Sequence, residues 1–414
     1  MRGRLSPFLM LCLVGFIARL GYQMARPPVL PRFAEELGAS TWLIGLIVGA
    51  STITGVLIKF PAGTLSDILG RRRMLLLGAA FFAFPPFLYL LVKDPYTLLA
   101  LRFLHGVATA VFSPVASAAV ADLFHKERGE KLGWFASAGE MGSAFGPLIG
   151  GAVLAAFASP GLTAFYYTYL IVGGLGVGTL LLAWRLPIGS PHSGTSRPPV
   201  ANPNVSRWHL FRQGMREVLS NRPILLASSV EAAMFLGVGA LLGFLPLYAK
   251  HVVRLSDASL GLLIWTPLVM AMVGKPLAGH LSDRMGRKPL ILAGLSCCMV
   301  ILPLIPLTTH VPTLLLEGCV FGLGMAIVTP ATNALVADLC KTGNYGSAMG
   351  VFGTIWDIGE ASGPILVGAL IAAFGTLETA SAYVVAFSIV ASVLLCVGVV
   401  FGLIGTAHPA TAKV

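Results

Sequence analysis

Apolar runs of about 20 residues recur along the whole chain, and short polar segments separate them. At 1.5 Å per residue, a helix of about 20 residues crosses the roughly 30 Å hydrocarbon layer of a bilayer. The runs are continuous and lack the alternation of transmembrane β-strands, so they predict helices. Twelve membrane-spanning helices are expected, at residues 6–30, 40–62, 72–92, 96–121, 132–157, 163–185, 223–249, 258–280, 288–309, 313–337, 347–373 and 381–405.

The twelve runs fall into two groups of six, separated by a segment rich in proline, glycine and basic residues. This pattern predicts a first half at residues 1–185, a cytoplasmic linker at 186–222 and a second half at 223–414. The linker begins with a flexible, proline-rich stretch. Its second part, residues 208–219, has apolar residues at helical spacing beside basic ones and is expected to form an amphipathic helix on the membrane surface.

Composition excludes a soluble enzyme of ordinary type. Of the 414 residues, 56% are hydrophobic and 11% are charged, whereas soluble globular proteins carry roughly 25% charged residues. Mean hydropathy is +0.85. The six cysteines lie in apolar spans or at their ends, so no extracellular disulfide framework is expected. The first apolar run continues beyond the length of a signal peptide and is interpreted as a retained helix.

The formal net charge of +11 is explained by the positions of the basic residues. Clusters of basic residues at 71–73, 126–131 and 284–288 lie in short loops. An even number of predicted spans separates each of these loops from the next, so all of them lie on the same side of the membrane. By the positive-inside rule, these loops, the linker and both termini are expected on the cytoplasmic side. The excess charge then sets the topology, and no nucleic-acid partner is expected.

The two halves repeat one another in sequence, which is the first pattern to seek in a long chain. Residues 97–123 align with residues 313–339 at an offset of 216, and residues 135–157 align with residues 352–374 at an offset of 217. Two homologous six-helix halves in the same orientation are therefore predicted. Such parallel repeats place a binding site between the halves, near the middle of the membrane.

A polar loop motif occurs at equivalent places in both halves. Its glycines allow a tight turn and close helix approach, and its carboxylate lies four residues before an arginine, so that the two can form a local ion pair. The alternative is a pair of topogenic loops with solvated charges. The motif residues are Gly63, Asp67, Gly70 and Arg71 in the first half, and Gly279, Asp283, Gly286 and Arg287 in the second.

This duplicated motif closely resembles the cytoplasmic loop motif of the major facilitator superfamily. The resemblance implies an all-α integral membrane fold, with twelve transmembrane helices arranged as two pseudo-symmetric six-helix bundles. It also implies that each loop acts as a latch in the outward-facing state, in which the arginine reaches an acid at the cytoplasmic end of the predicted helix 96–121 or 313–337. Asp122 and Asp338 occupy those positions.

A second pattern of the superfamily is matched by Arg102, followed by His105 and Gly106. The resemblance implies that this arginine lies in the core and is linked to proton coupling, because it sets the ionisation of a nearby carboxylate. His105 stands where relatives often have glutamine. It can titrate directly, or it can be a hydrogen-bonded packing residue.

A third match lies in the predicted helix 132–157 and resembles a motif of the superfamily's antiporters and exporters. Glycines four residues apart let a neighbouring helix pack closely, and the proline removes a backbone hydrogen bond so that the helix can bend. The motif favours export over uptake, and plain helix packing is the alternative. Its residues are Gly142, Gly146, Pro147 and Gly150.

Ionisable side chains inside membrane spans are costly unless they are paired or hydrated, so they mark candidate functional sites. For each of them the alternative is a buried pair that only fixes packing. In the superfamily, the first, fourth, seventh and tenth helices line the central cavity. The candidates for a substrate and proton cavity are Arg19, Arg102, His105, Glu140, Glu231, Glu317, Asp357 and Glu360.

Three further basic residues lie in the predicted spans. Lys59 and Lys275 are repeat-equivalent and are expected to have a structural or gating role, because they can reach the cytoplasmic surface. Arg26 lies with Arg19 in the first helix, where exporters of cationic drugs in the superfamily often carry an acid. This difference argues against a cationic drug as substrate.

These patterns predict a secondary active transporter of the inner (plasma) membrane that resembles the 12-helix drug/metabolite:proton antiporter branch. The expected activity is proton-coupled export of a small organic or amphiphilic compound by alternating access, with Glu140 or the Asp357–Glu360 pair as proton carrier. One alternative is uptake of an organic anion by a symporter or facilitator. Another is a transporter-like sensor or scaffold subunit.

Enzymatic activity is not expected. The sequence has no phosphate-binding loop, no serine nucleophile motif and no His/Cys cluster of metal-binding spacing. Neither a metal nor a cofactor is expected, and the proton gradient is the expected energy source. The expected partners are the small-molecule substrate, protons and the lipid bilayer, and the expected functional unit is a monomer.

Overall fold

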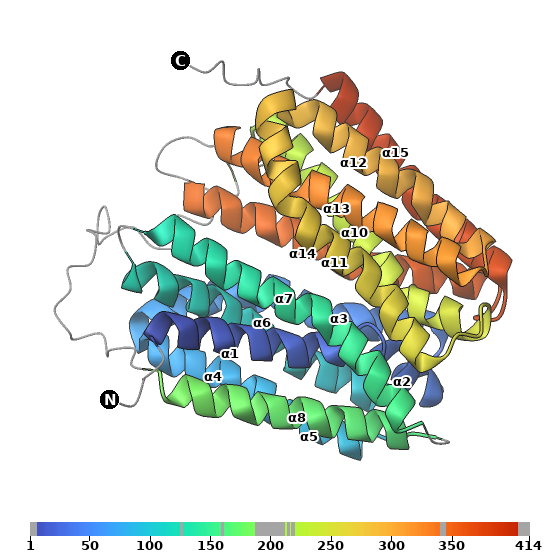
Figure 1. Cartoon of the computed structure of the whole chain (residues 1–414), viewed down its shortest axis with the longest axis horizontal. Coiled ribbons are helices and arrows are strands. Elements are labelled where there is room, and N and C mark those ends of the chain that lie inside the picture. Colours follow the sequence, from blue (N-terminus) through green and yellow to red (C-terminus); the bar gives the residue numbers. More distant parts are fainter. Residues whose placement is uncertain are drawn as a thin grey trace. The chain divides into compact units, whose positions relative to one another are not determined.

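The computed structural model describes residues 6–124, 127–158, 161–186, 212, 216, 220–339 and 345–404. Every regular element in these residues is a helix (Figure 1). The helices before the linker are α1 (Pro7–Met24), α2 (Leu30–Glu36), α3 (Thr41–Leu69), α4 (Arg71–Ala83), α5 (Pro85–Leu88), η1 (Tyr89–Leu91), α6 (Pro95–Leu123), α7 (Arg128–Ala156) and α8 (Thr163–Trp184). Those after it are α10 (Arg222–His251), α11 (Asp257–Met285), α12 (Arg287–Leu304), η2 (Ile305–Leu307), α13 (Val311–Leu339), α14 (Tyr345–Phe374) and α15 (Ala380–Ile404).

Eleven helical segments of the described chain are long and apolar enough to cross a membrane. They coincide with the predicted spans, apart from the span at 132–157. At that place α7 has 29 residues and is long enough, but its glycines, serines and charged residues lower its hydropathy. The predicted all-α membrane fold is confirmed. The amphipathic helix predicted at 208–219 lies almost wholly outside the described residues.

Two predicted spans are interrupted, and prolines give the physical reason. The span predicted at 6–30 ends with α1 at Met24, and Pro27 and Pro28 separate it from the short helix α2. The span predicted at 72–92 is divided where Pro85 begins α5. Proline lacks a backbone N–H and cannot donate the hydrogen bond that continues a helix, which places helix breaks at these positions.

The described chain divides into two compact units with the same internal plan. One comprises the described residues of Met1–Ala39, Ala50–Pro199 and Ser256–Trp265, and the other those of Ser40–Gly49, Val200–Leu255 and Thr266–Val414. In the first unit α1 packs against α7, and α4 packs against α6 and α8. In the second unit α10 packs against α14, and α12 packs against α13 and α15. The sequence repeat is therefore also a structural repeat.

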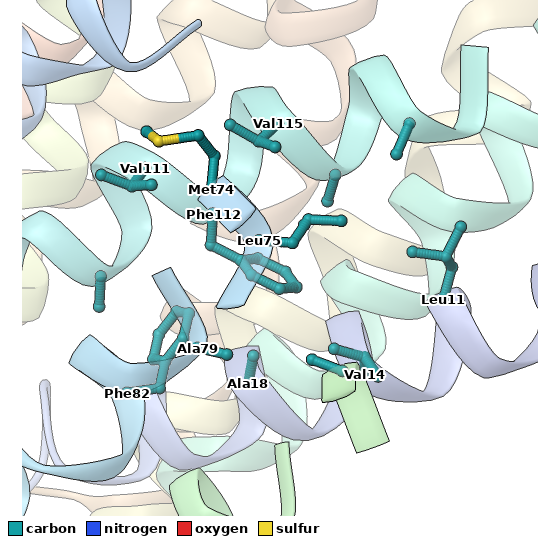
Figure 2. Packing of buried hydrophobic residues seen from close by; sticks show 14 of the residues in the cluster. Leu11, Val14, Ala18, Met74, Leu75, Ala79, Phe82, Val111, Phe112 and Val115 are labelled. Atoms are coloured by element: carbon teal, nitrogen blue, oxygen red, sulfur yellow. The ribbon is translucent and has the colours of Figure 1, made fainter. Parts of the chain in front are cut away.

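The core of the first unit forms where α1, α4 and α6 meet (Figure 2). Phe82 and Phe112 make an edge-to-face ring contact between α4 and α6, with ring centroids 5.6 Å apart. Gly78 in α4 lets α6 approach, because a Cβ there would lie 3.0 Å from the Cα of Phe112. Small and large apolar side chains thus alternate across the interface, as in close-packed protein interiors.

Asp94 is the N-cap of α6. Its carboxylate accepts hydrogen bonds from the backbone N–H groups of Tyr96, at 3.0 Å, and Thr97, at 2.9 Å. The hydroxyl of Thr97 donates a further one at 2.5 Å. These bonds, first of all the one from the Thr97 side chain, hold the pKa of Asp94 below its ordinary value.

Because the folded-state pKa of Asp94 is lowered, its stabilising effect is complete above the ordinary carboxyl range and is lost as the pH falls through the folded-state pKa. We expect Asp94→Ala to lower the thermal unfolding midpoint of the purified protein at pH 7, and the difference from wild type to shrink towards pH 3. Asp94→Asn, which can still cap the helix, should show a smaller loss. An equal loss for Asp94→Ala at both pH values would contradict this role of the charge.

Candidate functional site

The first loop motif lies between α3 and α4. Gly70 has a backbone φ of 92°, which glycine adopts without strain, and α4 begins at the next residue. The Nε of Arg71 lies 2.9 Å from Oδ2 of Asp122, at the end of α6. Its Nη1 donates to the hydroxyl of Ser66. The predicted contact between Arg71 and Asp122 is present, and the side chain of Asp67 lies outside the described residues.

The second loop motif repeats this geometry between α11 and α12. Gly286 has a φ of 90°. The Nη1 of Arg287 lies 2.5 Å from Oδ1 of Asp283 and donates to the hydroxyl of Ser282 at 3.0 Å. The Nε of Arg287 lies 3.4 Å from Oδ2 of Asp338. The three residues predicted to form this latch are therefore in contact.

Sequence reasoning gave no role to the serines of the two motifs. Ser66 and Ser282 are each only 1% exposed, and each accepts a hydrogen bond from the arginine five residues later. Their recurrence at the repeat offset was the signal that could have identified them. Each arginine is thus held by a buried hydroxyl as well as by a partly exposed carboxylate.

The close-approach role expected of the first glycine in each motif is not observed. A Cβ at Gly63 or Gly279 would meet no described atom within 4 Å. Both residues lie inside helices, α3 and α11, where no turn is required. Only Gly70 and Gly286 have the backbone conformation that explains a glycine.

The glycines of the predicted helix-5 motif line the contact of α7 with α1. A Cβ at Gly142 would overlap the carbonyl oxygen of Phe16, and one at Gly146 would lie 2.8 Å from the Cβ of Gln23. Gly150 packs against Met24 in the same way. Pro147 lies inside α7 between these contacts. The motif therefore brings two helix backbones together, as small residues do in membrane proteins.

Arg102 lies in the interior of the first unit with only 2% of its surface exposed. Its Nη2 donates to the hydroxyl of Ser51 at 2.6 Å, and its guanidinium lies 5.7 Å from the ring centroid of Tyr22. Among the described residues, no carboxylate pairs with it. The resemblance implied a nearby acid, but hydroxyl and aromatic groups surround the guanidinium here. These groups stabilise a buried cation less than a paired carboxylate would.

His105 lies one helical turn beyond Arg102 and is 1% exposed. Its Nδ1 and the hydroxyl of Tyr89 are 3.2 Å apart, and its ring meets that of Tyr22 edge-to-face with centroids 5.2 Å apart. Its Nε2 has no hydrogen-bond partner among the described residues. These contacts are those of a hydrogen-bonded packing residue.

Arg19 contacts α6 at a position far along the helix from Arg102. Its Nη2 donates to the hydroxyl of Ser113 at 3.2 Å, and Ser113 lies about 16 Å beyond Arg102 along the helix axis. The Cγ of Arg19 lies 3.7 Å from the position of a Cβ at Gly139, next to Glu140 in α7. The structure thus separates Arg19 from Arg102 and places it beside the helix that carries Glu140. Neither Arg19 nor Glu140 is without a partner.

Glu231 in α10 is fully buried in the second unit. The hydroxyl of Thr332 in α13 donates to its Oε2, and its Oε1 has no hydrogen-bond partner among the described residues. The ammonium group of Lys275 in α11 is close enough to attract the carboxylate. Burying a carboxylate is costly unless it is paired or hydrogen-bonded, so Glu231 remains a candidate functional residue in the structure.

The other acids of the second unit lie elsewhere. Glu317 is 9% exposed in α13, but it is about 22 Å from Thr332 along that helix, so the structure does not bring it to Glu231. Asp357 is buried, and Glu360 follows one turn later on α14. A Cβ at Gly239 would meet the carbonyl oxygen of Glu360, so this turn packs tightly against α10. Asp357 and Glu360 both have interaction partners.

One partly buried ion pair was not foreseen. Arg32 in α2 contacts Oδ1 of Asp257, the first residue of α11, inside the first unit. Arg32 lies between the predicted spans 6–30 and 40–62, and the sequence pattern assigned it no role. No short-range sequence spacing links these residues, because 225 positions separate them. No group of three or more His, Cys, Asp or Glu residues in the described chain is arranged to hold a metal ion.

Comparisons with known proteins agree with this architecture. The family model described as Major Facilitator Superfamily matches residues 11–274 and 230–414. The Uncharacterized MFS-type transporter MJ1560 of Methanocaldococcus jannaschii is 26% identical over 359 residues, which cover 86% of this chain and 87% of that protein. Multidrug resistance protein 2 of Bacillus subtilis is 25% identical over 358 residues, which cover 86% of each chain.

Among solved structures, the nucleoside transporter NupG superposes with a TM-score of 0.79 at 13% sequence identity. The match covers 96% of this chain and 99% of that one. At this identity the likeness shows the fold alone. With the family match across the chain, the duplicated loop motif and the repeated helix packing, the protein is a membrane transporter, and the chain belongs to the Major Facilitator Superfamily.

Proposed function

We propose that the protein exports a small organic or amphiphilic compound across the inner membrane in exchange for protons. The name of the relative Multidrug resistance protein 2 supports export, and the glycine contacts between α7 and α1 fit the motif that the superfamily's exporters carry. The proposed functional unit is a monomer. Both termini are placed in the cytoplasm, because the basic loops favour that orientation. The proton gradient supplies the energy, and no cofactor takes part.

The observation that carries proton coupling is the environment of Glu231. This carboxyl group is fully buried in the second unit, has one hydrogen-bonded oxygen and one oxygen without a described partner, and lies near Lys275. A group in this setting changes its interactions strongly when it gains or loses a proton. Glu140, Asp357 and Glu360, which sequence reasoning favoured as carriers, all have interaction partners in the structure.

Coupling then follows from competition between two ligands for one conformational equilibrium. If the proton and the substrate favour opposite states of the alternating-access cycle, uptake of one drives release of the other. The two loop latches stabilise one of these states on the cytoplasmic side. The substrate acts through the same equilibrium, so substrate addition should release protons.

The test is a proton-flux assay on proteoliposomes of the full chain. A pH gradient is imposed, and cationic, anionic, zwitterionic and lipid-like compounds are added in turn while internal pH is recorded. Antiport predicts that a transported compound dissipates the gradient by moving against the protons. Proton movement in the same direction as the compound would show symport, and no response to any compound would favour a sensor or scaffold.

Uptake of an organic anion remains the second candidate, because one observation favours it. Arg102 is a fully buried cation with no carboxylate partner among the described residues. A buried cation without a counter-charge is costly, and an anionic ligand reaching it would compensate its charge. The same assay separates the two candidates. A symporter would move the anion and the protons in the same direction, and a facilitator would move the anion without any proton movement.

The second loop latch gives a further expectation. We expect Arg287→Ala to slow transport about tenfold, because it removes contacts to Asp283, Asp338 and Ser282, and partly exposed ion pairs are each worth up to about 1 kcal/mol. The measurement is the initial transport rate per amount of folded protein. Arg284→Ala is the matched control, since Arg284 is an exposed arginine in the last turn of α11, beside the same motif. An equal slowing in both variants would show that the loop's charge matters and the latch does not.

A further inference from the structure

A groove of about 400 Å³ opens along the outer surface of the second unit, between α12 and α15. Its lining is apolar apart from Ser296, and its rim residue Leu403 is 81% exposed. The lining comes from Leu292, Leu295 and Met299 on α12 and from Gly398, Val399 and Gly402 on α15, among others. Both helices are long and apolar enough to cross a membrane, so we expect this groove to face hydrocarbon.

Two glycines make the groove. Gly398 and Gly402 are one turn apart on α15 and have no side chains to fill the space in front of α12. A Cβ at Gly398 would lie 3.1 Å from Cδ2 of Leu295, and one at Gly402 would lie 3.7 Å from Cδ1 of Leu292. The two leucines therefore form the floor, and the glycine backbone forms one wall.

The groove runs parallel to the helices and has the length of one leaflet. On α12 the lining residues Leu292, Leu295 and Met299 follow the spacing of one helix face. On α15 the lining extends from residue 394 to residue 403, about 13 Å at 1.5 Å per residue. Half of a roughly 30 Å hydrocarbon layer is of similar length.

A basic residue stands at one end of the groove. Lys288 is one turn before Leu292 on the same face of α12, in the first turn of that helix. The positive-inside rule places this end at the cytoplasmic leaflet, which is where anionic phospholipids attract basic side chains. The groove thus combines an apolar channel of leaflet length with a cation at the headgroup level.

We propose that the α12–α15 groove binds one anionic phospholipid of the cytoplasmic leaflet, with an acyl chain between the helices and its phosphate at Lys288. The acyl chain lies in the groove between Leu292 and Leu295 on α12 and Gly398 and Gly402 on α15. The charge of Lys288 gives the site its preference for anionic over zwitterionic headgroups. This inference is independent of the transported substrate and of the direction of transport.

The test is native mass spectrometry of the full chain, purified in detergent and titrated with phosphatidylglycerol or phosphatidylcholine. Wild type should retain one phosphatidylglycerol in preference to phosphatidylcholine. Gly398→Leu fills the groove and should weaken retention of phosphatidylglycerol at least about tenfold. Lys288→Gln should remove the preference between the two lipids. Gly174→Leu is the control, since Gly174 is an exposed glycine on α8 with open space around it.

A second variant keeps the test decisive if Gly398→Leu fails to fold. Val399 lines the groove and is 49% exposed, so Val399→Phe narrows the groove at a position with more room than Gly398. Unchanged phosphatidylglycerol retention in a folded groove variant would overturn the proposal. It would also be overturned if wild type were a dimer that the groove variants dissociate, because a second copy of the chain would then occupy the groove.

Discussion

Replacing Glu231 with glutamine is expected to reduce transport driven by a pH gradient to the level of liposomes without protein. Glutamine has nearly the same volume and can still accept the hydrogen bond from Thr332, but it cannot gain or lose a proton. The measurement is substrate movement against its concentration gradient in proteoliposomes with an imposed pH gradient. The amount of folded protein should not change, because the buried contact is preserved.

Two controls make this result specific. Glu378→Gln changes an exposed carboxylate in a loop of the same unit and should transport normally. Substrate counterflow, which needs alternation without net proton movement, should persist in Glu231→Gln. If Glu231→Gln still accumulates substrate against its gradient, the proton carrier is another carboxylate, and Glu140→Gln and Asp357→Asn become the variants to test.

Gly142→Ala is expected to destabilise the protein by about 1–3 kcal/mol, the usual effect of forcing extra volume into a packed interface. The new Cβ would overlap the carbonyl oxygen of Phe16 and lie 3.0 Å from the backbone nitrogen of Leu20, so α1 must move away from α7. Backbone atoms cannot move aside as a flexible side chain can. The measurement is the thermal unfolding midpoint of the purified protein.

Gly133→Ala is the matched control in the same helix. A Cβ at Gly133 meets no described atom within 4 Å, and alanine has a higher helix propensity than glycine, so this variant should be neutral or slightly stabilised. Gly359→Ala tests the repeat, since a Cβ at Gly359 in α14 would overlap the carbonyl oxygen of Ala232 in α10. Equal stability of Gly133→Ala and Gly142→Ala would contradict the close-packing role of the motif.

The two loop motifs show how far sequence spacing carries a site prediction. Arg71 and Asp122, like Arg287 and Asp338, lie at the ends of neighbouring helices, and a helix end can be placed from hydropathy and charge. Their contact was therefore predictable from the repeat and the family motif. The serines that hold the same arginines were not assigned a role, because the direction in which a serine points depends on the turn that Gly70 or Gly286 makes.

The intramembrane charged residues could be identified from the sequence, but their contacts could not. Eight residues were grouped as one candidate cavity. Yet Glu231 contacts α13 at Thr332, far along that helix from Glu317, and Arg19 contacts α6 at Ser113, far along that helix from Arg102. A hydrophobic pattern fixes which residues lie in a span, but it does not fix the rotation of one helix against another. The partners Thr332 for Glu231 and Ser51 for Arg102 follow from that rotation.

By itself, the sequence determined that the chain spans a membrane many times, that it consists of two repeated halves and that it belongs to a transporter family. These properties follow from hydropathy, from the repeat offsets and from motifs that are local in sequence. Only the tertiary structure decided which groups surround each buried charge, which glycines bring helix backbones together and where a groove remains open. Those features depend on contacts between residues far apart in the chain, and side-chain packing sets such contacts.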